Sequence, residues 1–243
     1  MAQKGMTGET AGNSDVETIA SAQLVKVSKT YETAAARITA LQDMTWAVQA
    51  GEAVALMGPS GCGKTTILNL LGGMDRPSGG DIWVNGENVA QMTERQLEQY
   101  RLHKVGFVFQ FFNLIPSLSA VENLELPMLM AGAAAGARRA RAEALLETVG
   151  LKEKGFKRPE ELSGGEQQRV AVCLALVNDP QIILADEPTG NLDSNNARII
   201  SDLLYDLAKS RGKTVIVASH DPKVVERFPR VFHMRDGAIE QTV

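Results

Sequence analysis

Nine residues between an apolar segment and a helix-like segment constrain this chain more than any other feature. The stretch GPSGCGKTT, residues 58–66, follows the apolar run Val54 to Met57, and residues 67–71 then show helix-type apolar spacing. The predicted order is therefore a buried strand, a glycine loop and a helix. Three glycines in such a loop let the backbone come close to a bound group, because a side chain would block that approach.

The spacing GxxxxGK[ST] in this setting predicts a phosphate-binding loop. Its backbone N–H groups would surround a β-phosphate, while the following helix points its positive end at the same charge. Lys64 would reach the β- and γ-phosphates, and Thr65 would place a hydroxyl on Mg²⁺. With glycine at about 7% of residues, the bare pattern occurs by chance in about one chain in a hundred, and the flanking strand and helix reduce that chance further. The expected nucleotide-binding residues of the loop are Gly58, Pro59, Ser60, Gly61, Cys62, Gly63, Lys64, Thr65 and Thr66.

Composition excludes several other classes of protein. The 243 residues carry a net charge of −4, whereas proteins that bind nucleic acid in bulk usually have a basic surplus. The basic cluster at residues 138–141 is expected to be a solvated helix face.

Cys62 and Cys173 cannot form a disulfide framework or a metal site at this spacing, and they suit a reducing cytoplasm. No apolar run approaches the roughly 18 to 20 residues that span a bilayer, and the polar residues 1–20 are expected to be disordered.

The rest of the chain is predicted to form an α/β core in two sequence blocks with a helical insertion between them. Residues 23–57 alternate as strands do, and Asn85-Gly86 predicts a hairpin because a type I′ turn needs positive φ. Three helix starts have the capping-box pattern, in which Glu or Gln lies three residues after Ser or Thr. They are Thr93 with Gln96, Ser119 with Glu122, and Ser163 with Glu166. Further strands are expected at 105–109, 181–185 and 214–218, a helix at 194–210, and a closing hairpin at 231–242.

Chemically active side chains follow three of the predicted strands. Asp186 and Glu187 end an apolar strand, where Asp186 can bind Mg²⁺ through water and Glu187 can orient or deprotonate an attacking water. His220 and Gln110 follow two further strands, and ligands collect at such carboxyl ends in open α/β sheets. A lone histidine is more often structural, but this placement favours a γ-phosphate contact for His220. The Gln110 amide is expected to contact the metal or the attacking water.

A second helix start is also suited to an anion. The sequence Ser163-Gly164-Gly165-Glu166 would expose backbone N–H groups at the positive end of a helix. Because the chain already has its own phosphate loop, this second helix start is expected to serve the nucleotide of another copy. An ordinary capped helix would explain the serine and the glutamate but not both glycines.

Together these residues resemble the ATP-binding subunit of an ABC transporter. The Walker A loop is GPSGCGKTT, the signature motif is LSGGEQQRV and Walker B is IILADE, with Gln110 in the Q-loop and His220 in the H-loop. The D-loop is Gly190-Asn191-Leu192-Asp193, and Tyr31 matches the aromatic residue that stacks on adenine. The resemblance covers about residues 22–243. A narrower resemblance, in GFVFQFFNLIPSLSAVENLELPM and DEPTGNLD, is to the group of lipoprotein-releasing, macrolide-export and cell-division ATPases.

This resemblance implies a fold and a mode of action. The fold would be an α/β P-loop NTPase (RecA-like) core with an N-terminal antiparallel β subdomain, at about 21–90 and 169–243, and an α-helical subdomain at about 91–168. Two copies would form a head-to-tail dimer that holds ATP and Mg²⁺. Each nucleotide would lie between the Walker A loop of one copy and the signature motif of the other. The implied contacts outside the Walker A loop are Tyr31, Asp186, Ser163, Gly164, Gly165, Glu166 and Asp193, and the implied metal ligands are Thr65, Gln110 and Asp186.

Hydrolysis would drive a separate inner-membrane permease from the cytoplasmic side. The resemblance implies a permease with four transmembrane helices and a periplasmic domain, and a periplasmic adaptor is a further candidate partner. Five apolar residues after Gln110 are expected either to pack against the helical insert or to line a groove for a cytoplasmic helix of the permease. They are Phe111, Phe112, Leu114, Ile115 and Pro116. Family members commonly have IARAL where this chain has VCLAL at 172–176. The missing arginine lies outside the implied nucleotide contacts, so the difference concerns the packing of the subunit rather than its chemistry.

The motifs also occur in proteins with two other functions. A soluble ABC protein of DNA repair or translation is disfavoured, because the chain has neither a long heptad insertion nor a second ATPase half. An ATP-dependent signalling module that acts across the membrane, of the cell-division type, remains open beside transport. Movement of a substrate in a reconstituted complex distinguishes the two.

Overall fold

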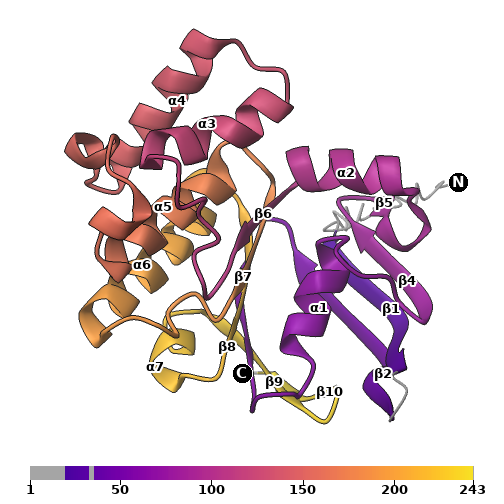
Figure 1. The fold of residues 1–243 in the computed structure, drawn as a ribbon. Coiled ribbons are helices and arrows are strands. Elements are labelled where there is room, and N and C mark those ends of the chain that lie inside the picture. Colours follow the sequence, from indigo (N-terminus) through magenta and orange to yellow (C-terminus); the bar gives the residue numbers. More distant parts are fainter. Residues whose placement is uncertain (1–19, 33–35, 243) are drawn as a thin grey trace, which may run out of the picture.

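The structure is a computed structural model that describes residues 20–32 and 36–242. The disordered segment expected at residues 1–20 lies outside this range except for Ala20, with which the first strand begins. Two sheets and the helices around them make up the described part of the chain (Figure 1).

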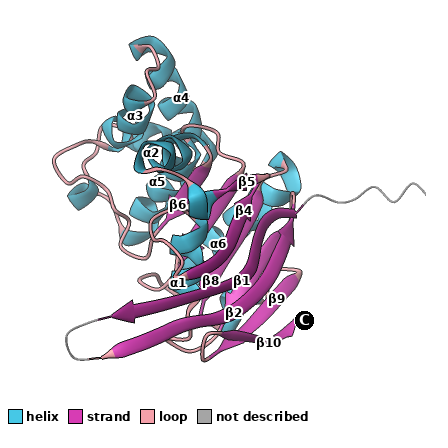
Figure 2. Cartoon of the chain, turned by 90° about the vertical axis from the view of Figure 1, so that its right-hand side faces the viewer, coloured by secondary structure: helices cyan, strands magenta, loops and turns pink. Residues whose placement is uncertain are grey.

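The smaller sheet is antiparallel and has the strand order β2-β1-β4-β5. Figure 2 shows its two long strands, β1 and β2, running side by side. The hairpin expected at Asn85-Gly86 is confirmed, because both residues have positive φ, 47° and 82°, and they join β4 to β5. Trp46 meets Phe232 of the larger sheet edge to face, with 5.3 Å between ring centroids, so the two sheets share a core. The strands are β1 (Ala20–Glu32), β2 (Arg37–Gln49), β4 (Gly79–Val84) and β5 (Glu87–Asn88).

The larger sheet has six strands in the order β10-β9-β3-β8-β7-β6. All of them are parallel to their neighbours except β10, which pairs with β9 in antiparallel. The carboxyl ends of β3, β6, β7 and β8 therefore lie at one edge, and the segments that carry the predicted site residues leave the sheet there. The strands are β3 (Ala53–Met57), β6 (Val105–Val108), β7 (Ile182–Asp186), β8 (Thr214–Ser219), β9 (Arg230–Arg235) and β10 (Ala238–Thr242).

Helices cover both faces of the larger sheet. Helix α1 lies between the two sheets, and α5, α6 and α7 lie on the opposite face (Figure 1). All three capping boxes are confirmed, since the Thr93, Ser119 and Ser163 hydroxyls each accept from the backbone N–H three residues on. The α-helices are α1 (Lys64–Leu71), α2 (Glu94–His103), α3 (Ala120–Met130), α4 (Ala135–Thr148), α5 (Gly164–Leu176), α6 (Ser194–Arg211) and α7 (Pro222–Val225). Single turns of 3₁₀ helix are η1 (Val89–Gln91), η2 (Lys152–Lys154) and η3 (Pro159–Glu161).

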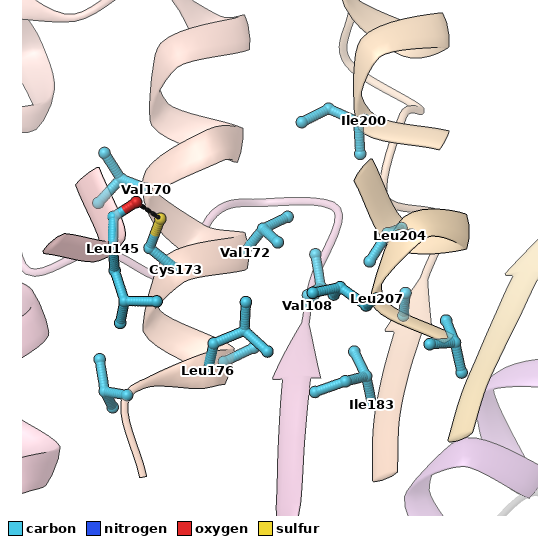
Figure 3. Close-up of a cluster of buried hydrophobic side chains, with 14 of the residues drawn as sticks. Val108, Leu145, Val170, Val172, Cys173, Leu176, Ile183, Ile200, Leu204 and Leu207 are labelled. Atoms are coloured by element: carbon cyan, nitrogen blue, oxygen red, sulfur yellow. Dashed lines mark hydrogen bonds between the residues drawn. The ribbon is translucent and has the colours of Figure 1, made fainter. Parts of the chain in front are cut away.

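Alternation along the central strands divides the interior into two clusters. In β3, Val54 and Leu56 face α1 and the smaller sheet, whereas Ala53 and Ala55 face the helices on the other side. The cluster that contains Ala53 and Ala55 joins strands of the larger sheet to α3, α4, α5 and α6. In this cluster the Cys173 thiol donates to the Leu145 carbonyl at 3.4 Å (Figure 3). Because both faces of the central strands are buried, the sheet edge is a rigid support for the site.

The α/β fold class is confirmed, with a P-loop type parallel sheet and a separate antiparallel sheet. The division into subdomains stays a proposal. Within the range 91–168, β6 pairs with β7 in the larger sheet, and Leu97 and Tyr100 of α2 pack into the cluster around α1. The helices that stand apart from the sheets are α3 and α4 (Figure 1), so we propose a helical subdomain that begins after β6.

Candidate nucleotide-binding site

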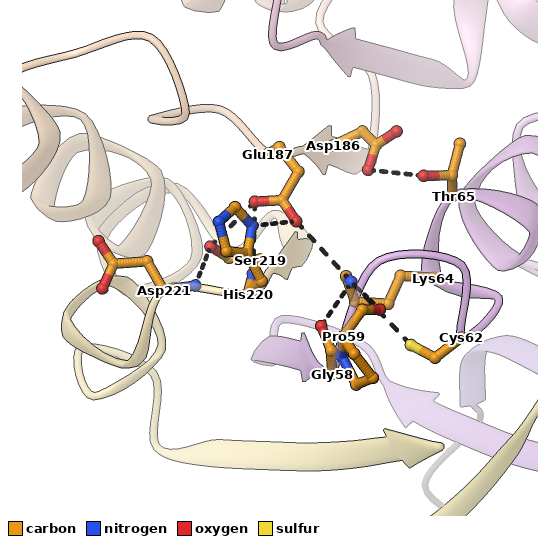
Figure 4. Close-up of polar contacts among 10 residues, drawn as sticks. All are labelled: Gly58, Pro59, Cys62, Lys64, Thr65, Asp186, Glu187, Ser219, His220 and Asp221. Carbon is orange, nitrogen blue, oxygen red and sulfur yellow. Dashed lines mark hydrogen bonds and ion pairs between the residues drawn. The ribbon is translucent and has the colours of Figure 1, made fainter. Parts of the chain in front are cut away.

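The phosphate loop runs from the end of β3 to the start of α1. Glycine is required at Gly58, because a Cβ there would collide with the backbone carbonyl of Met234. Gly63, with φ 105°, ends the loop directly before α1. The Lys64 ammonium lies inside the loop and donates to the carbonyls of Gly58 at 2.7 Å and Pro59 at 3.1 Å (Figure 4). A buried ammonium beside a helix N-terminus makes this loop attractive to phosphate.

Thr65 lies opposite the acid that ends β7. Thr65 Oγ1 donates to Asp186 Oδ1 at 3.1 Å (Figure 4). Burial raises the pKa of Asp186 above its ordinary value, and the negative charge of Glu187 acts in the same direction, against the Thr65 hydrogen bond and the charge of Lys64. Hydroxyl and carboxylate oxygens are ligands that Mg²⁺ prefers. The donor set therefore fits the metal that the sequence predicts.

Glu187 is held by the segment that follows β8. Its carboxylate accepts hydrogen bonds from the Ser219 hydroxyl at 3.2 Å and from the His220 backbone N–H at 3.3 Å. His220 Nδ1 lies 3.0 Å from Glu187 Oε1, and Lys64 Nζ lies 3.8 Å from the same oxygen (Figure 4). A carboxylate can only accept, so Nδ1 carries the proton in this contact. Glu187 also has φ 44°, a rare conformation for a side chain of this size, of the kind that clusters at functional sites.

Gln110 leaves the same sheet edge at the end of β6. Its amide lies against Gly190, where an added Cβ would be 2.8 Å from Gln110 Nε2. Asn191 Nδ2 donates to the Gln110 carbonyl at 3.0 Å. The structure thus brings the Q-loop glutamine next to the D-loop.

Tyr31 lies near the end of β1. Its hydroxyl donates to Asp75 Oδ2 at 2.9 Å, and the Lys29 ammonium lies 4.7 Å from the ring centroid. Burial raises the pKa of Tyr31, and the contact with Asp75 acts in the same direction, whereas a hydrogen bond with Thr66 opposes them. Tyr31 is 37% exposed and adjoins α1 through Thr66, so it lies beside the phosphate loop.

The signature motif lies on a different element from the residues above. Ser163 caps α5, and its hydroxyl accepts from Glu166 N–H while Glu166 accepts from Ser163 N–H at 3.0 Å. The Glu166 carboxylate also accepts from the Lys154 ammonium, and this hydrogen bond, ahead of the one from the Ser163 backbone, lowers the pKa of Glu166. Ser163 is exposed and Gly164 is partly exposed. Their backbone therefore remains accessible at the positive end of α5.

The two glycines of the signature motif meet different surroundings. A Cβ on Gly165 would collide with the Asn196 side chain, so packing against α6 already requires glycine there. At Gly164 an added Cβ would find only ordinary contacts, 3.7 Å to Leu192 and 3.8 Å to Phe112. Gly164 is thus the glycine that internal packing does not explain.

Asp193 has a local role in this structure. It caps α6 by accepting from Asn195 N–H and Asn196 N–H, each at 3.0 Å, and from the Asn196 amide at 2.6 Å. These bonds lower the pKa of Asp193, with the Asn196 backbone contributing most. Its predicted contact with nucleotide therefore stays a prediction.

Contacts join one group of the predicted residues at the sheet edge, whereas the signature motif and Asp193 lie at the starts of α5 and α6. The residues that meet around the phosphate loop are Gly58, Pro59, Cys62, Lys64, Thr65, Asp186, Glu187 and His220 (Figure 4). Sequence reasoning missed Ser219 and Asp75, which hold Glu187 and Tyr31. Ser219 directly precedes His220, so its place at a strand end was the available signal; Asp75 had none.

Among residues 20–32 and 36–242, no helix is both long enough and apolar enough to cross a membrane.

Known proteins of one family are similar to this chain in sequence. The family model for ABC transporters matches residues 41–190. The lipoprotein-releasing system ATP-binding protein LolD of Idiomarina loihiensis is 42% identical over 216 residues, 89% of this chain and 95% of that protein. The macrolide export ATP-binding/permease protein MacB of Hyphomonas neptunium is 45% identical over 217 residues, 89% of this chain but 34% of that protein.

A solved structure shows the same fold. It is a dimeric post-hydrolysis state of an ATP-binding cassette bound to ADP and Pi, with a TM-score of 0.85 and 40% sequence identity. The alignment covers 91% of this chain and 97% of that one. The chain therefore belongs to the ABC transporter family, as an ATP-binding subunit of the LolD and MacB type and an ATPase.

Proposed function

We propose that this chain hydrolyses ATP at the edge of the larger sheet in order to drive a separate membrane permease. The observation that carries the proposal is the convergence of Lys64, Thr65, Asp186, Glu187 and His220 from three different segments onto the phosphate loop. An ammonium, a hydroxyl with an acid, and a second acid held by a histidine are the groups that phosphoryl transfer to water requires.

Each group has a distinct proposed role. Lys64 would bind the β- and γ-phosphates, and Tyr31 would stack on the adenine. Thr65, Asp186 and Gln110 would hold Mg²⁺, which when bound would neutralise charge that develops on the phosphates. Glu187 would orient the attacking water and take its proton. His220, whose Nδ1 proton faces Glu187, would leave Nε2 for the γ-phosphate.

The signature motif would serve the nucleotide of a second copy. Ser163 and Gly164 lie at the surface on α5, whereas the hydrolytic residues lie at the carboxyl ends of β3, β7 and β8. A similar cassette has been solved as a dimer with ADP and Pi. A ligand at about 100 times its dissociation constant stabilises the state that binds it by about 2.7 kcal/mol per site. ATP would therefore close a head-to-tail dimer, and hydrolysis would open it.

A pair of variants tests this dimer. Glu187→Gln keeps the shape of the side chain and removes the proposed base, so this variant should bind ATP, turn over slowly and elute as a dimer in gel filtration with ATP and Mg²⁺. Ser163→Asp in the same background should still cap α5, because Asp is as good an N-cap as Ser, but its charge would repel the partner's phosphate. The double variant should elute as a monomer with an unchanged melting temperature.

Two results would contradict the proposed dimer. One is a Glu187→Gln protein that remains monomeric at saturating ATP and Mg²⁺. The other is a double variant that dimerises as well as Glu187→Gln alone, since the signature serine would then lie away from the nucleotide.

The partner proposed for the dimer is an inner-membrane permease on whose cytoplasmic side the chain would bind. The names of the LolD and MacB relatives support this, as does a cavity of about 280 Å³ where α3, α5 and β6 meet. Phe107, Phe109, Pro127 and Leu174 contribute apolar side chains to it. Leu174 stands where family members commonly have arginine, so this chain would accept a more apolar side chain from its permease. We propose four transmembrane helices and a periplasmic domain for that permease, with a periplasmic adaptor as a further partner and no nucleic acid.

A further inference from the structure

Two consecutive backbone carbonyls after β6 are each bound by a side-chain amide from another part of the fold. Gln168 Nε2, on α5, donates to the Phe109 carbonyl at 3.2 Å. Asn191 Nδ2, in the loop before α6, donates to the Gln110 carbonyl at 3.0 Å. The bonded partners are 59 and 81 positions apart in the sequence. We call Gln168 and Asn191 the amide clamp.

The surroundings of the clamp leave little freedom for the Gln110 backbone. Gln168 is fully buried, and a buried side-chain amide whose partner moved away would lose its hydrogen bond without access to water. Gly190 lies against the Gln110 side chain, since a Cβ at residue 190 would be 2.8 Å from Gln110 Nε2. The Gln110 segment is therefore attached to α5 on one side and to the D-loop on the other.

We propose that the amide clamp positions Gln110 for hydrolysis and ties it to the surfaces that face a second copy. Gln168 lies on the helix that Ser163 caps, and Asn191 lies two residues before Asp193, the cap of α6. A displacement of Gln110 at one nucleotide therefore moves the elements that would contact the other nucleotide. The inference rests on the proposed role of Gln110, and it adds two positioning residues that do not touch the nucleotide themselves.

The variant that tests the clamp is Asn191→Asp, measured as steady-state ATP hydrolysis by the full chain. Asn191 is exposed, so the isosteric change should leave folding intact, but a carboxylate cannot donate to the Gln110 carbonyl. We expect kcat to fall about tenfold, equivalent to ~1.4 kcal/mol, with KM for ATP changed less than about twofold because the phosphate loop is intact. The matched control is Asn195→Asp, which makes the same change of charge four residues away and should keep wild-type kcat.

A double-mutant cycle with Gln110→Ala separates positioning from a general structural effect. If Asn191 acts through Gln110, then Asn191→Asp should cost nothing further in the Gln110→Ala background. Gln168→Met keeps the length of the side chain but removes the amide donor. It should lower kcat in the wild-type background and cause no further loss of kcat in the Gln110→Ala background. An equal loss of kcat in both backgrounds would overturn the proposal, as would an Asn191→Asp protein with wild-type kcat beside an impaired Gln110→Ala protein. A Gln110→Ala protein with wild-type kcat would instead overturn the role of Gln110, and the clamp with it.

Discussion

Substitution of two adjacent glycines separates internal packing from partner contact in the signature motif. At Gly165 an added Cβ would overlap the side-chain oxygen and the amide carbon of Asn196. Even the more distant Asn196 nitrogen would be only 3.0 Å away. Asn196 cannot easily rotate aside, because it accepts from Arg169 at 3.4 Å and donates to Asp193 at 2.6 Å. At Gly164 the nearest atoms would be at ordinary van der Waals distances. The two substitutions therefore add the same methyl group with opposite steric consequences.

The magnitude follows from the packing. Overfilling a packed site costs about 1–3 kcal/mol, and for a domain of this size each kcal/mol shifts Tm by about 2–4 °C. We expect Gly165→Ala to lower Tm by about 2–12 °C. Gly164→Ala should keep or slightly raise Tm, because alanine has the better helix propensity by up to about 1 kcal/mol.

The assay is thermal unfolding followed by circular dichroism, combined with gel filtration in ATP and Mg²⁺. Asn196→Ala makes room for the new Cβ, so Gly165→Ala should cost less than about 0.5 kcal/mol in that background. Gly164→Ala, introduced into the Glu187→Gln protein, should weaken ATP-dependent dimerisation although the fold is intact. A Gly165→Ala protein as stable as wild type, or one whose loss Asn196→Ala does not relieve, would refute the packing argument.

Two further predictions concern pH and the permease. Burial raises the pKa of Asp186 above its ordinary value of 3.8, so the folded protein binds this proton more tightly than the unfolded chain. Asp186 therefore lowers the free energy of unfolding by an amount that grows as pH rises from 3.8 through the folded pKa. Asp186→Asn should therefore raise Tm at neutral pH and lose that advantage toward pH 4 in a pH series of melting curves; a difference that is independent of pH would contradict this origin. Phe111 is 73% exposed, and Phe111→Asp should reduce co-purification with the permease without lowering Tm, whereas Glu98→Lys, an exposed change on α2, should leave binding intact. If the Phe111→Asp protein co-purifies with the permease as well as wild type does, Phe111 does not contribute to this contact.

Features that depend on a few neighbouring residues were predictable. The capping boxes at Thr93, Ser119 and Ser163 formed as expected, because each requires only two side chains three positions apart and a helix between them. The turn at Asn85-Gly86 is equally local, since the conformational preferences of these two residues set it.

Features that depend on which side chains share an interior could not be predicted from the sequence. Of the five apolar residues after Gln110, Leu114 packs against the core cluster, whereas Phe111 projects into solvent. Both belong to one short apolar run, and sequence pattern could not separate them. The strand expected at residues 105–109 did form as β6, but the sequence could not say which strand lies beside it, and only the structure shows that it pairs with β7.

The sequence by itself determined the phosphate loop, the acids at a strand end and the nucleotide chemistry that they imply, because glycine placement, helix caps and strand ends are set within a few residues along the chain. Only the tertiary structure decided that Thr65 meets Asp186 across 121 positions, that Ser219 holds Glu187, and that Asn196 requires glycine at 165. Contacts of this kind depend on strand order and on how closely two helices pack. Those are properties of the whole interior, and no short segment carries them.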